Sequence, residues 1–174
     1  MSDGVTVDGS LFEALARVLQ PQGAYAEELR AAGFDVRAPK MRYPNEVLVA
    51  TLDITHKHLY PDLTREQAHR RVGQRMVGSF FDTIFGKVVR TLLQVLGPER
   101  FLVRLPKIAP MGTTGLHVRV ERPAPGEVRL FFSGQLLSPS FIAGAMEATS
   151  TGISVELVLP ANPTAFELRV TGLR

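Results

Sequence analysis

Through residues 8–108, apolar side chains recur every three or four positions, which is the period of helices that bury one face. The pattern predicts a short strand near residues 5–7 and helices over about 10–20, 24–33, 44–60 and 64–96. Ser10 with Glu13, and Thr64 with Gln67, have the spacing of a capping box, which marks a helix start. We therefore expect a helical half of about four to five helices.

The helix predicted over residues 64–96 contains three glycines, Gly73, Gly78 and Gly86. Each of them costs about 1 kcal/mol relative to alanine in a helix interior. The segment is also long for one helix of a globular protein. We expect either a kink or break near Gly86, or another backbone packed closely against the glycines.

After about residue 113 the period changes from three or four to two. Leu116, Val118 and Val120 share one face of a predicted strand, and the alternation returns over residues 127–133, 153–160 and 165–171. A helical segment over about 138–152 interrupts these strands. The pattern predicts an antiparallel β-β-α-β-β sheet half over about 113–174. Together with the helical half it predicts an α+β fold, with residues 1–174 forming a single domain.

The composition is that of an ordinary globular chain, with 45% hydrophobic and 21% charged residues in 174. The absence of cysteine excludes disulfides, thiolate metal sites and cysteine nucleophiles. The polar start, MSDGVTVDGS, does not have the pattern of a signal or transit peptide, and no run of apolar residues is long enough to span a bilayer. These features predict a cytoplasmic protein.

Positive charge gathers in the middle of the chain, where residues 56–107 hold ten Lys/Arg against four Asp/Glu. Arg70, Arg71, Arg75 and Lys107 are candidates for an anion-binding patch. The alternative is an ordinary solvated helix face. Nucleic acid is not expected as a partner, because no aromatic residues interleave with these charges to stack on bases.

The segment ITHKHLY invites a metal-site interpretation, because His56 and His58 are followed by His69. On the predicted helix His56 and His58 fall on nearly opposite sides and cannot bind the same ion. We therefore predict no metal site and no cofactor. His58 is expected to face the core, where it is either a satisfied core residue or the border of a pocket.

No pair of titratable groups in the sequence marks an active site. Asp82 stands among aromatic residues in SFFDTIFG and is either an exposed acid or a buried one that needs a partner. Ser138 and Ser140 flank Pro139 without the G-x-S-x-G pattern of a nucleophile elbow, so they are interpreted as helix caps.

Aromatic residues are the most informative candidates for a binding site. Phe80 and Phe85 lie close together on the predicted long helix, and Phe141 lies on the helix between the strands. Phe131 follows the polar alternation and so points away from Phe132. Either helices cover both faces of the sheet, or an apolar pocket or surface is left for a ligand or partner.

The chain contains the short motifs F-E-x-L at residues 12–15, L-Y-P at 59–61 and L-G-P at 96–98. The order and spacing of these and other short motifs resemble a paralogous family found in myxobacteria, a conserved domain with no assigned catalytic residues. The likeness covers nearly the full length, including the β-β-α-β-β part with its IAGAMEA helix. It implies a shared fold and a bacterial cytosolic setting, and it transfers no site. The matching positions are Phe12, Glu13, Leu15, Gly33, Asp35, Tyr43, Pro44, Leu59, Tyr60, Pro61, Ala68, Gly73, Thr83, Gly86, Leu96, Gly97 and Pro98.

A looser likeness concerns architecture alone. Helices leading into an antiparallel sheet with a helix across it are similar to the fold of haem-nitric-oxide sensor domains, vinyl-reductase-type ligand-binding domains and trafficking-complex subunits. That likeness implies an apolar pocket between helices and sheet. The Y-x-S-x-R motif of the haem sensors is absent, so haem is not expected.

These features favour a non-catalytic, regulatory or scaffolding module that binds a small apolar ligand or a protein partner between helices and sheet. Its candidate ligand-binding residues are His58, Phe80, Asp82, Phe85, Phe131 and Phe141. The first alternative is an enzyme whose dispersed active site surrounds Asp82, His58 and His69. The second is anion or nucleic-acid binding through the basic middle segment. Oligomeric state is not determined by the sequence, and a homodimer stays open.

Overall fold

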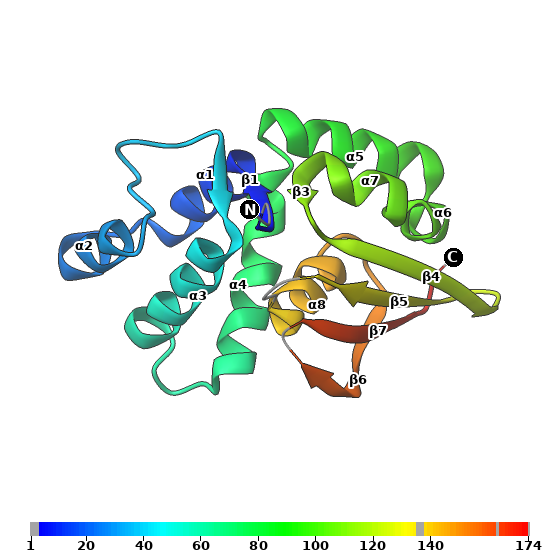
Figure 1. Ribbon diagram of the computed structural model, residues 1–174. Helices are drawn as coiled ribbons and strands as arrows, with labels where there is room; N and C mark the ends of the chain where they lie inside the picture. Colours follow the sequence, from blue (N-terminus) through cyan, green and yellow to red (C-terminus); the bar gives the residue numbers. More distant parts are fainter. Residues whose placement is uncertain (1–3, 135–137, 163, 174) are drawn as a thin grey trace.

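The computed structural model describes residues 4–134, 138–162 and 164–173. Its helices form a cluster beside an antiparallel sheet (Figure 1). The helices are α1 (Gly9–Leu19), α2 (Gly23–Ala31), α3 (Asn45–Leu59), α4 (Arg65–Phe80), α5 (Ile84–Leu96), α6 (Pro98–Val103), α7 (Leu105–Gly112) and α8 (Pro139–Glu147). The strands are β1 (Thr6–Asp8), β2 (Arg42–Pro44), β3 (Thr113–Thr114), β4 (His117–Ala124), β5 (Glu127–Ser133), β6 (Ser154–Asn162) and β7 (Ala165–Thr171).

One of the two predicted capping boxes is formed. At the start of α4 the Thr64 side chain accepts from the backbone N–H of Gln67, and the Gln67 side chain accepts from the backbone of Thr64. The prediction for α1 is wrong, because Asp8 caps that helix by accepting from the backbone N–H of Ser10 at 2.8 Å. An aspartate one residue before the helix competes well for the cap position.

The predicted break in the long helix is confirmed. Helix α4 ends at Phe80 and α5 begins at Ile84, so the break lies just before Gly86. Thr83 stabilises it, because its hydroxyl donates to the carbonyl of Phe80 at 2.7 Å and accepts from the N–H of Gly86 at 3.0 Å. A side chain on Gly86 would collide with the Phe80 carbonyl oxygen, so a glycine is required there.

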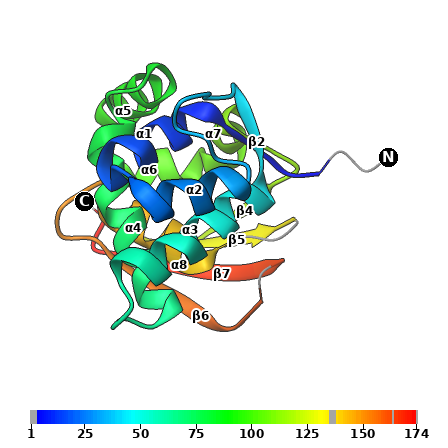
Figure 2. The ribbon, with the colours of Figure 1, turned by 90° about the vertical axis from the view of Figure 1, so that its left-hand side faces the viewer.

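Close packing against a glycine also occurs, where α4 crosses α8. A methyl group on Gly73 would collide with the carbonyl oxygen of Phe141, and one on Gly144 would collide with that of Arg70. The absence of both side chains lets the two backbones touch. This contact fixes α8 between the helical cluster and the sheet (Figure 2).

Several short elements are not predicted by the periodicity. Helices α6 and α7 occupy residues 98–112, where prolines obscure the helical pattern. The short strand predicted near residues 5–7 is present as β1, which pairs antiparallel with β2 and with β3 in a small three-stranded sheet. Strands β2 and β3, of three and two residues, were not predicted, because they are too short to produce a recognisable alternation.

The main sheet has the strand order β4-β5-β7-β6, with every neighbouring pair antiparallel. The predicted α+β class is confirmed, and α8 follows β5 and precedes β6 as expected. Val128, Leu130 and Phe132 of β5 are buried with Leu168 and Val170 of β7 against α6, α7 and α8. None of the helices formed by the described residues combines the length and apolar character of a bilayer-spanning segment.

The other face of the main sheet is polar. Arg129 pairs with Glu167 on the neighbouring strand, and Arg169 pairs with Glu127 at 2.8 Å. Phe131 lies on this face with the guanidinium of Arg119 3.9 Å from its ring centre and that of Arg129 at 5.4 Å. Cation–π stacking thus accounts for an aromatic residue on a charged surface.

Candidate functional site

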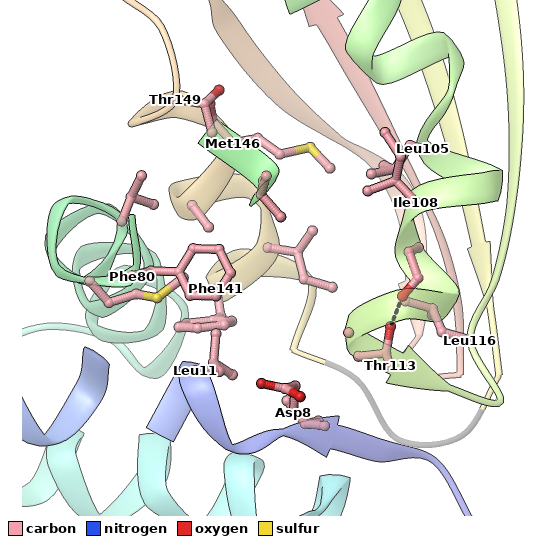
Figure 3. Close-up of a pocket in the computed structure, with 18 of the residues that line it drawn as sticks. Asp8, Leu11, Phe80, Leu105, Ile108, Thr113, Leu116, Phe141, Met146 and Thr149 are labelled. Carbon is pink, nitrogen blue, oxygen red and sulfur yellow. Dashed lines mark hydrogen bonds between the residues drawn. The ribbon is translucent and has the colours of Figure 1, made fainter. Parts of the chain in front are cut away.

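An apolar pocket of about 280 Å³ lies where the helical cluster meets α8 and the main sheet. Figure 3 shows Leu11, Phe80 and Phe141 along one side and Leu105 and Ile108 along the other. Its volume is near the lower end of the range found for small-molecule sites. The pocket therefore has the size of a site for a small organic molecule.

The pocket lining draws on both sequence halves and is almost wholly hydrophobic. Its apolar members come from β1, α1, α3, the α4–α5 region, α6, α7 and α8, and from β5 and the loop before β4. They are Val7, Leu11, Leu48, Met76, Val77, Phe80, Phe81, Phe85, Val89, Phe101, Leu102, Leu105, Ile108, Ala109, Leu116, Phe132, Phe141, Ile142, Ala145 and Met146.

Helix α5 forms part of one wall of the pocket, through Phe85 and Val89. Among its described residues only Gly86 is fully buried, while Leu92, Leu93 and Leu96 are half-buried and pack against the core of the main sheet. Gly112 of α7 faces Phe85, and a methyl group there would come within 2.6 Å of the Phe85 ring. Small residues at such points preserve the hollow.

Five polar side chains interrupt the lining: Asp8, Asn45, Thr113, Ser138 and Thr149. The hydroxyl of Thr113 donates to the carbonyl of Ala109 in α7 at 2.9 Å, and that of Thr149 donates to the carbonyl of Met146 in α8 at 2.6 Å. Asp8 accepts from the α1 backbone, and Ser138 contacts His69. Four of the five thus already have a partner within the protein.

Asn45 is the exception. It is 3% exposed, and its Nδ2 has no hydrogen-bond partner among the described residues. A buried amide nitrogen without an acceptor costs free energy. Asn45 is among the residues that line the pocket, and its Nδ2 atom is buried.

Three of the six residues predicted to bind a ligand line this pocket together, namely Phe80, Phe85 and Phe141. Phe80 and Phe85 also contact each other edge to face, with ring centres 5.9 Å apart. Phe131 lies on the opposite, charged face of the sheet. Neither His58 nor Asp82 is part of the pocket lining.

The structure does not bring Asp82, His58 and His69 together. Asp82 is exposed in the break between α4 and α5. His58 stacks on Tyr25 with ring centres 5.0 Å apart, and its Nε2 lies 3.2 Å from Oε1 of Glu28. His56 forms a hydrogen bond of 2.8 Å with the carbonyl of Leu63. In the part of the chain that the structure describes, no three His, Asp or Glu side chains converge as metal ligands.

The basic residues predicted to bind an anion are distributed over separate surroundings. Arg70 forms an ion pair with Glu147, with 3.0 Å between Nε and Oε2, and also donates to the carbonyl of Val155. Arg75 donates to the Tyr60 hydroxyl and to the carbonyl of Val18. Arg71 on α4 and Lys107 on α7 are exposed on different helices.

One cluster was missed by the sequence interpretation. His69 is 1% exposed, and its Nδ1 lies 2.8 Å from Oγ of Ser138. Its Nε2 lies 3.0 Å from Oδ1 of Asp53. The three residues come from α3, α4 and the N-cap of α8, and no local motif connects them. The one available signal was the position of His69 between Ala68 and Val72 on the buried side of α4.

The environment of this cluster sets its charge states. Burial, and then the positive charge of Arg65, hold the pKa of His69 below its ordinary value in spite of the opposing effect of Asp53. Burial tends to raise the pKa of Asp53, but the hydrogen bonds from Arg65 outweigh it and the pKa is lowered. At neutral pH the cluster therefore contains a neutral imidazole and an ionised carboxylate.

A family model described as "Protein of unknown function (DUF2378)" matches residues 2–170. The match agrees with the sequence resemblance, which also covered nearly the full length. No curated protein sequence matches the chain.

Solved structures with the same fold are also found. An H-NOX protein from S. oneidensis in the Fe(II)NO ligation state has a TM-score of 0.71 at 10% identity, covering 96% of this chain and 99% of that one. An oxygen-binding H-NOX domain related to soluble guanylate cyclases has a TM-score of 0.64 at 14% identity, with 94% and 91% covered. A structure that probes haem distortion in the H-NOX family has a TM-score of 0.66 at 12% identity, with 94% and 92% covered. The expected likeness to that fold is confirmed.

Proposed function

The chain belongs to the family described as "Protein of unknown function (DUF2378)", and from that premise we propose that it is a regulatory module which binds a small, uncharged, largely apolar ligand. The observation that carries this proposal is the pocket between the helical cluster, α8 and the sheet. It is lined by apolar side chains from both halves of the chain. A single domain over residues 1–174 follows from the same arrangement and is part of the proposal.

The charge of the lining argues for an uncharged ligand. Asp8 is the one charged side chain among the described lining residues, and it already accepts a backbone N–H. A carboxylate or phosphate in this pocket would lose its hydration without gaining a cationic partner, which is costly. Hydrocarbon and aromatic groups would instead be transferred from water into an apolar environment.

The Asn45 amide narrows the ligand class further. Its unpartnered Nδ2 donor favours a ligand with one acceptor, such as a ketone, ester or ether oxygen. A hydrogen bond that satisfies a buried donor contributes about 1 kcal/mol. The ligand class proposed is therefore a small apolar molecule with one acceptor oxygen.

A regulatory role is supported by how the pocket is built. Its walls include α5, which also packs against the core of the main sheet, and α7, which leads directly into β3. A ligand that fills the space contacts elements of both halves at once and changes their packing. The related folds include an oxygen-binding H-NOX domain related to soluble guanylate cyclases, and this likeness supports ligand sensing as the use of the pocket.

Haem does not fit the pocket. Haem iron in proteins is held by His, Cys, Met or Tyr side chains, and the described lining contains no His, Cys or Tyr. Met76 and Met146 are its only donors of those types. It also contains no Arg or Lys to neutralise the haem propionates. The shared fold therefore does not carry haem binding to this chain.

The proposal predicts binding of Prodan, an uncharged naphthyl ketone whose emission shifts to shorter wavelength in apolar surroundings. Ala145 lines the pocket on α8, so Ala145→Leu fills part of the space and should weaken binding at least about tenfold. Asn45→Leu removes the donor and should weaken binding several-fold, since about 1 kcal/mol is lost. The measurement is a fluorescence titration of the purified protein.

Ala148→Leu is the matched control. Ala148 is the C-cap residue of α8, three residues after Ala145, but it is exposed and does not line the pocket. The affinity of this variant should equal that of the unmodified chain. Haemin added in parallel should keep the absorbance of free haemin. Equal Prodan affinity in the Ala145 and Ala148 variants, or no binding at all, contradicts the proposal.

A further inference from the structure

Ser138, His69 and Asp53 form a continuous hydrogen-bonded chain across three helices, and one end of it reaches the pocket lining. We propose that Ser138 is a nucleophile activated by His69, and that the protein hydrolyses uncharged apolar esters bound in the pocket. This rests on the proposed function, because the apolar lining would hold the acyl chain. It adds a chemical step that binding alone does not require.

The direction of each hydrogen bond follows from the donors available. An ionised carboxylate can only accept, so the 3.0 Å contact with Asp53 requires the proton of the neutral imidazole on Nε2 of His69. Nδ1 is then a bare acceptor. The 2.8 Å contact between Nδ1 and Oγ of Ser138 must therefore use the serine proton. His69 is thus in the tautomer that a general base for Ser138 needs.

The surroundings of His69 keep its imidazole neutral, so that Nδ1 can accept the serine proton. Burial holds its pKa below the ordinary value, with help from the nearby positive charge of Arg65 and a smaller effect of His56. The carboxylate of Asp53 opposes both and stabilises the imidazolium once it forms. Arg65 fixes that carboxylate through two hydrogen bonds, of 2.6 and 3.1 Å. Asp53 and Arg65 act as positioning residues, the roles that a catalytic triad requires.

The place of Ser138 in the fold suits a nucleophile. It is the N-cap of α8, a helix of nine residues, and it is also among the pocket-lining residues. The positive end of the helix dipole favours negative charge near this point. A substrate carbonyl in the pocket that meets Ser138 therefore develops its oxyanion in a favourable field.

The reaction proceeds in two steps. Oγ of Ser138 attacks the ester carbonyl carbon while Nδ1 of His69 takes the hydroxyl proton. The tetrahedral intermediate then breaks its bond to the alkoxy oxygen, which leaves as an alcohol with the proton from His69. In the second step His69 takes a proton from water, the hydroxide attacks the acyl-enzyme, and Oγ leaves and recovers that proton. The products are an alcohol and a carboxylic acid.

The experiment uses an uncharged alkyl fluorophosphonate, from which a nucleophilic serine displaces fluoride and retains the phosphonyl group. Mass spectrometry of the whole chain and of its peptides should find one label, on Ser138. The rate at which each variant hydrolyses p-nitrophenyl octanoate should change in parallel with its labelling. Ser138→Ala should abolish both signals, as should Ser138→Asn, which keeps a residue suited to the N-cap position and so protects α8.

Ser140→Ala is the matched control. Ser140 is 8% exposed against 7% for Ser138, and it lies two residues along the chain but outside the pocket lining. This variant should label and hydrolyse like the unmodified chain. Asp53→Asn should fold, yet slow both reactions by about 10²–10⁴-fold, the range of a general-base contribution. Its rate should also depend on pH differently from that of the unmodified chain.

The outcomes separate the two proposals. Prodan binding with no labelling, or labelling that persists in folded Ser138→Ala, contradicts the nucleophile and leaves the ligand-binding proposal intact. If Prodan does not bind but Ser138 is labelled, the result contradicts the proposed function instead. An Asp53→Asn variant that reacts at full rate contradicts the triad even if Ser138 is labelled.

Discussion

Two glycines on α4 illustrate how differently the same residue acts in two surroundings. Gly73 meets the backbone of α8, with a carbonyl oxygen of Phe141 where its Cβ would lie. Gly78, five residues later, has open space at that position. Both lie within α4, Gly78 in its last turn. The main difference between them is the packing of α8 against Gly73.

Gly73→Ala should lower the free energy of unfolding by about 1–3 kcal/mol, because the added methyl forces α4 and α8 apart. Gly78→Ala should raise it by about 0.5–1 kcal/mol, since alanine loses less backbone entropy on folding. Urea denaturation of both variants beside the unmodified chain measures the two changes. Equal effects of the two substitutions would show that α4 and α8 are not in backbone contact.

At the scale of elements, the buried His69 connects three helices, with partners on α3 and at the start of α8. Its pKa is lowered, mainly by burial, so the folded state favours the neutral ring. Below the ordinary histidine pKa of about 6.5, the unfolded chain binds a proton that the folded chain excludes. The contribution of His69 to the free energy of unfolding is therefore fully present above about pH 6.5, and it decreases as the pH falls toward the pKa of His69 in the folded state.

We therefore predict that the melting temperature falls between pH 7.5 and 5.5, and that His69→Gln flattens this dependence. His117→Gln is the control, because His117 is exposed on β4. Thermal unfolding of the three proteins across this pH range measures the effect. A His69→Gln slope as steep as that of the unmodified chain would mean that another group is responsible.

Elements with a long, regular period are those that the sequence predicts well. The amphipathic helices, the β-β-α-β-β order and the break before Gly86 all follow from spacing and from glycine. Helices α6 and α7 were missed because each is short and proline-rich. The pattern identified Ser138 and Ser140 as caps; Ser138 is the N-cap of α8, whereas Ser140 lies inside that helix. The contact of Ser138 with His69, 69 residues away, depends on how α4 and α8 cross and has no counterpart in local sequence.

At the scale of the whole molecule, the pocket depends on the relation between the two halves of the chain. The sequence identified Phe80, Phe85 and Phe141 as candidates, because Phe80 and Phe85 lie close together on the predicted long helix and Phe141 lies on the helix between the strands. It could not show the unfilled space, because that space depends on how helices and strands from both halves of the chain pack around it. A shared fold at 10–14% identity leaves the lining free to differ. That is why the haem chemistry of the related structures does not follow from the fold.

The most direct test of the ligand-binding pocket is a crystal structure of the chain grown with Prodan. We predict electron density for the naphthyl rings between Phe80, Phe141 and Ile108, with the ketone oxygen within hydrogen-bond distance of Nδ2 of Asn45. A structure in which Phe85 and Met146 have collapsed into this space, with Prodan absent or bound elsewhere, would contradict the account.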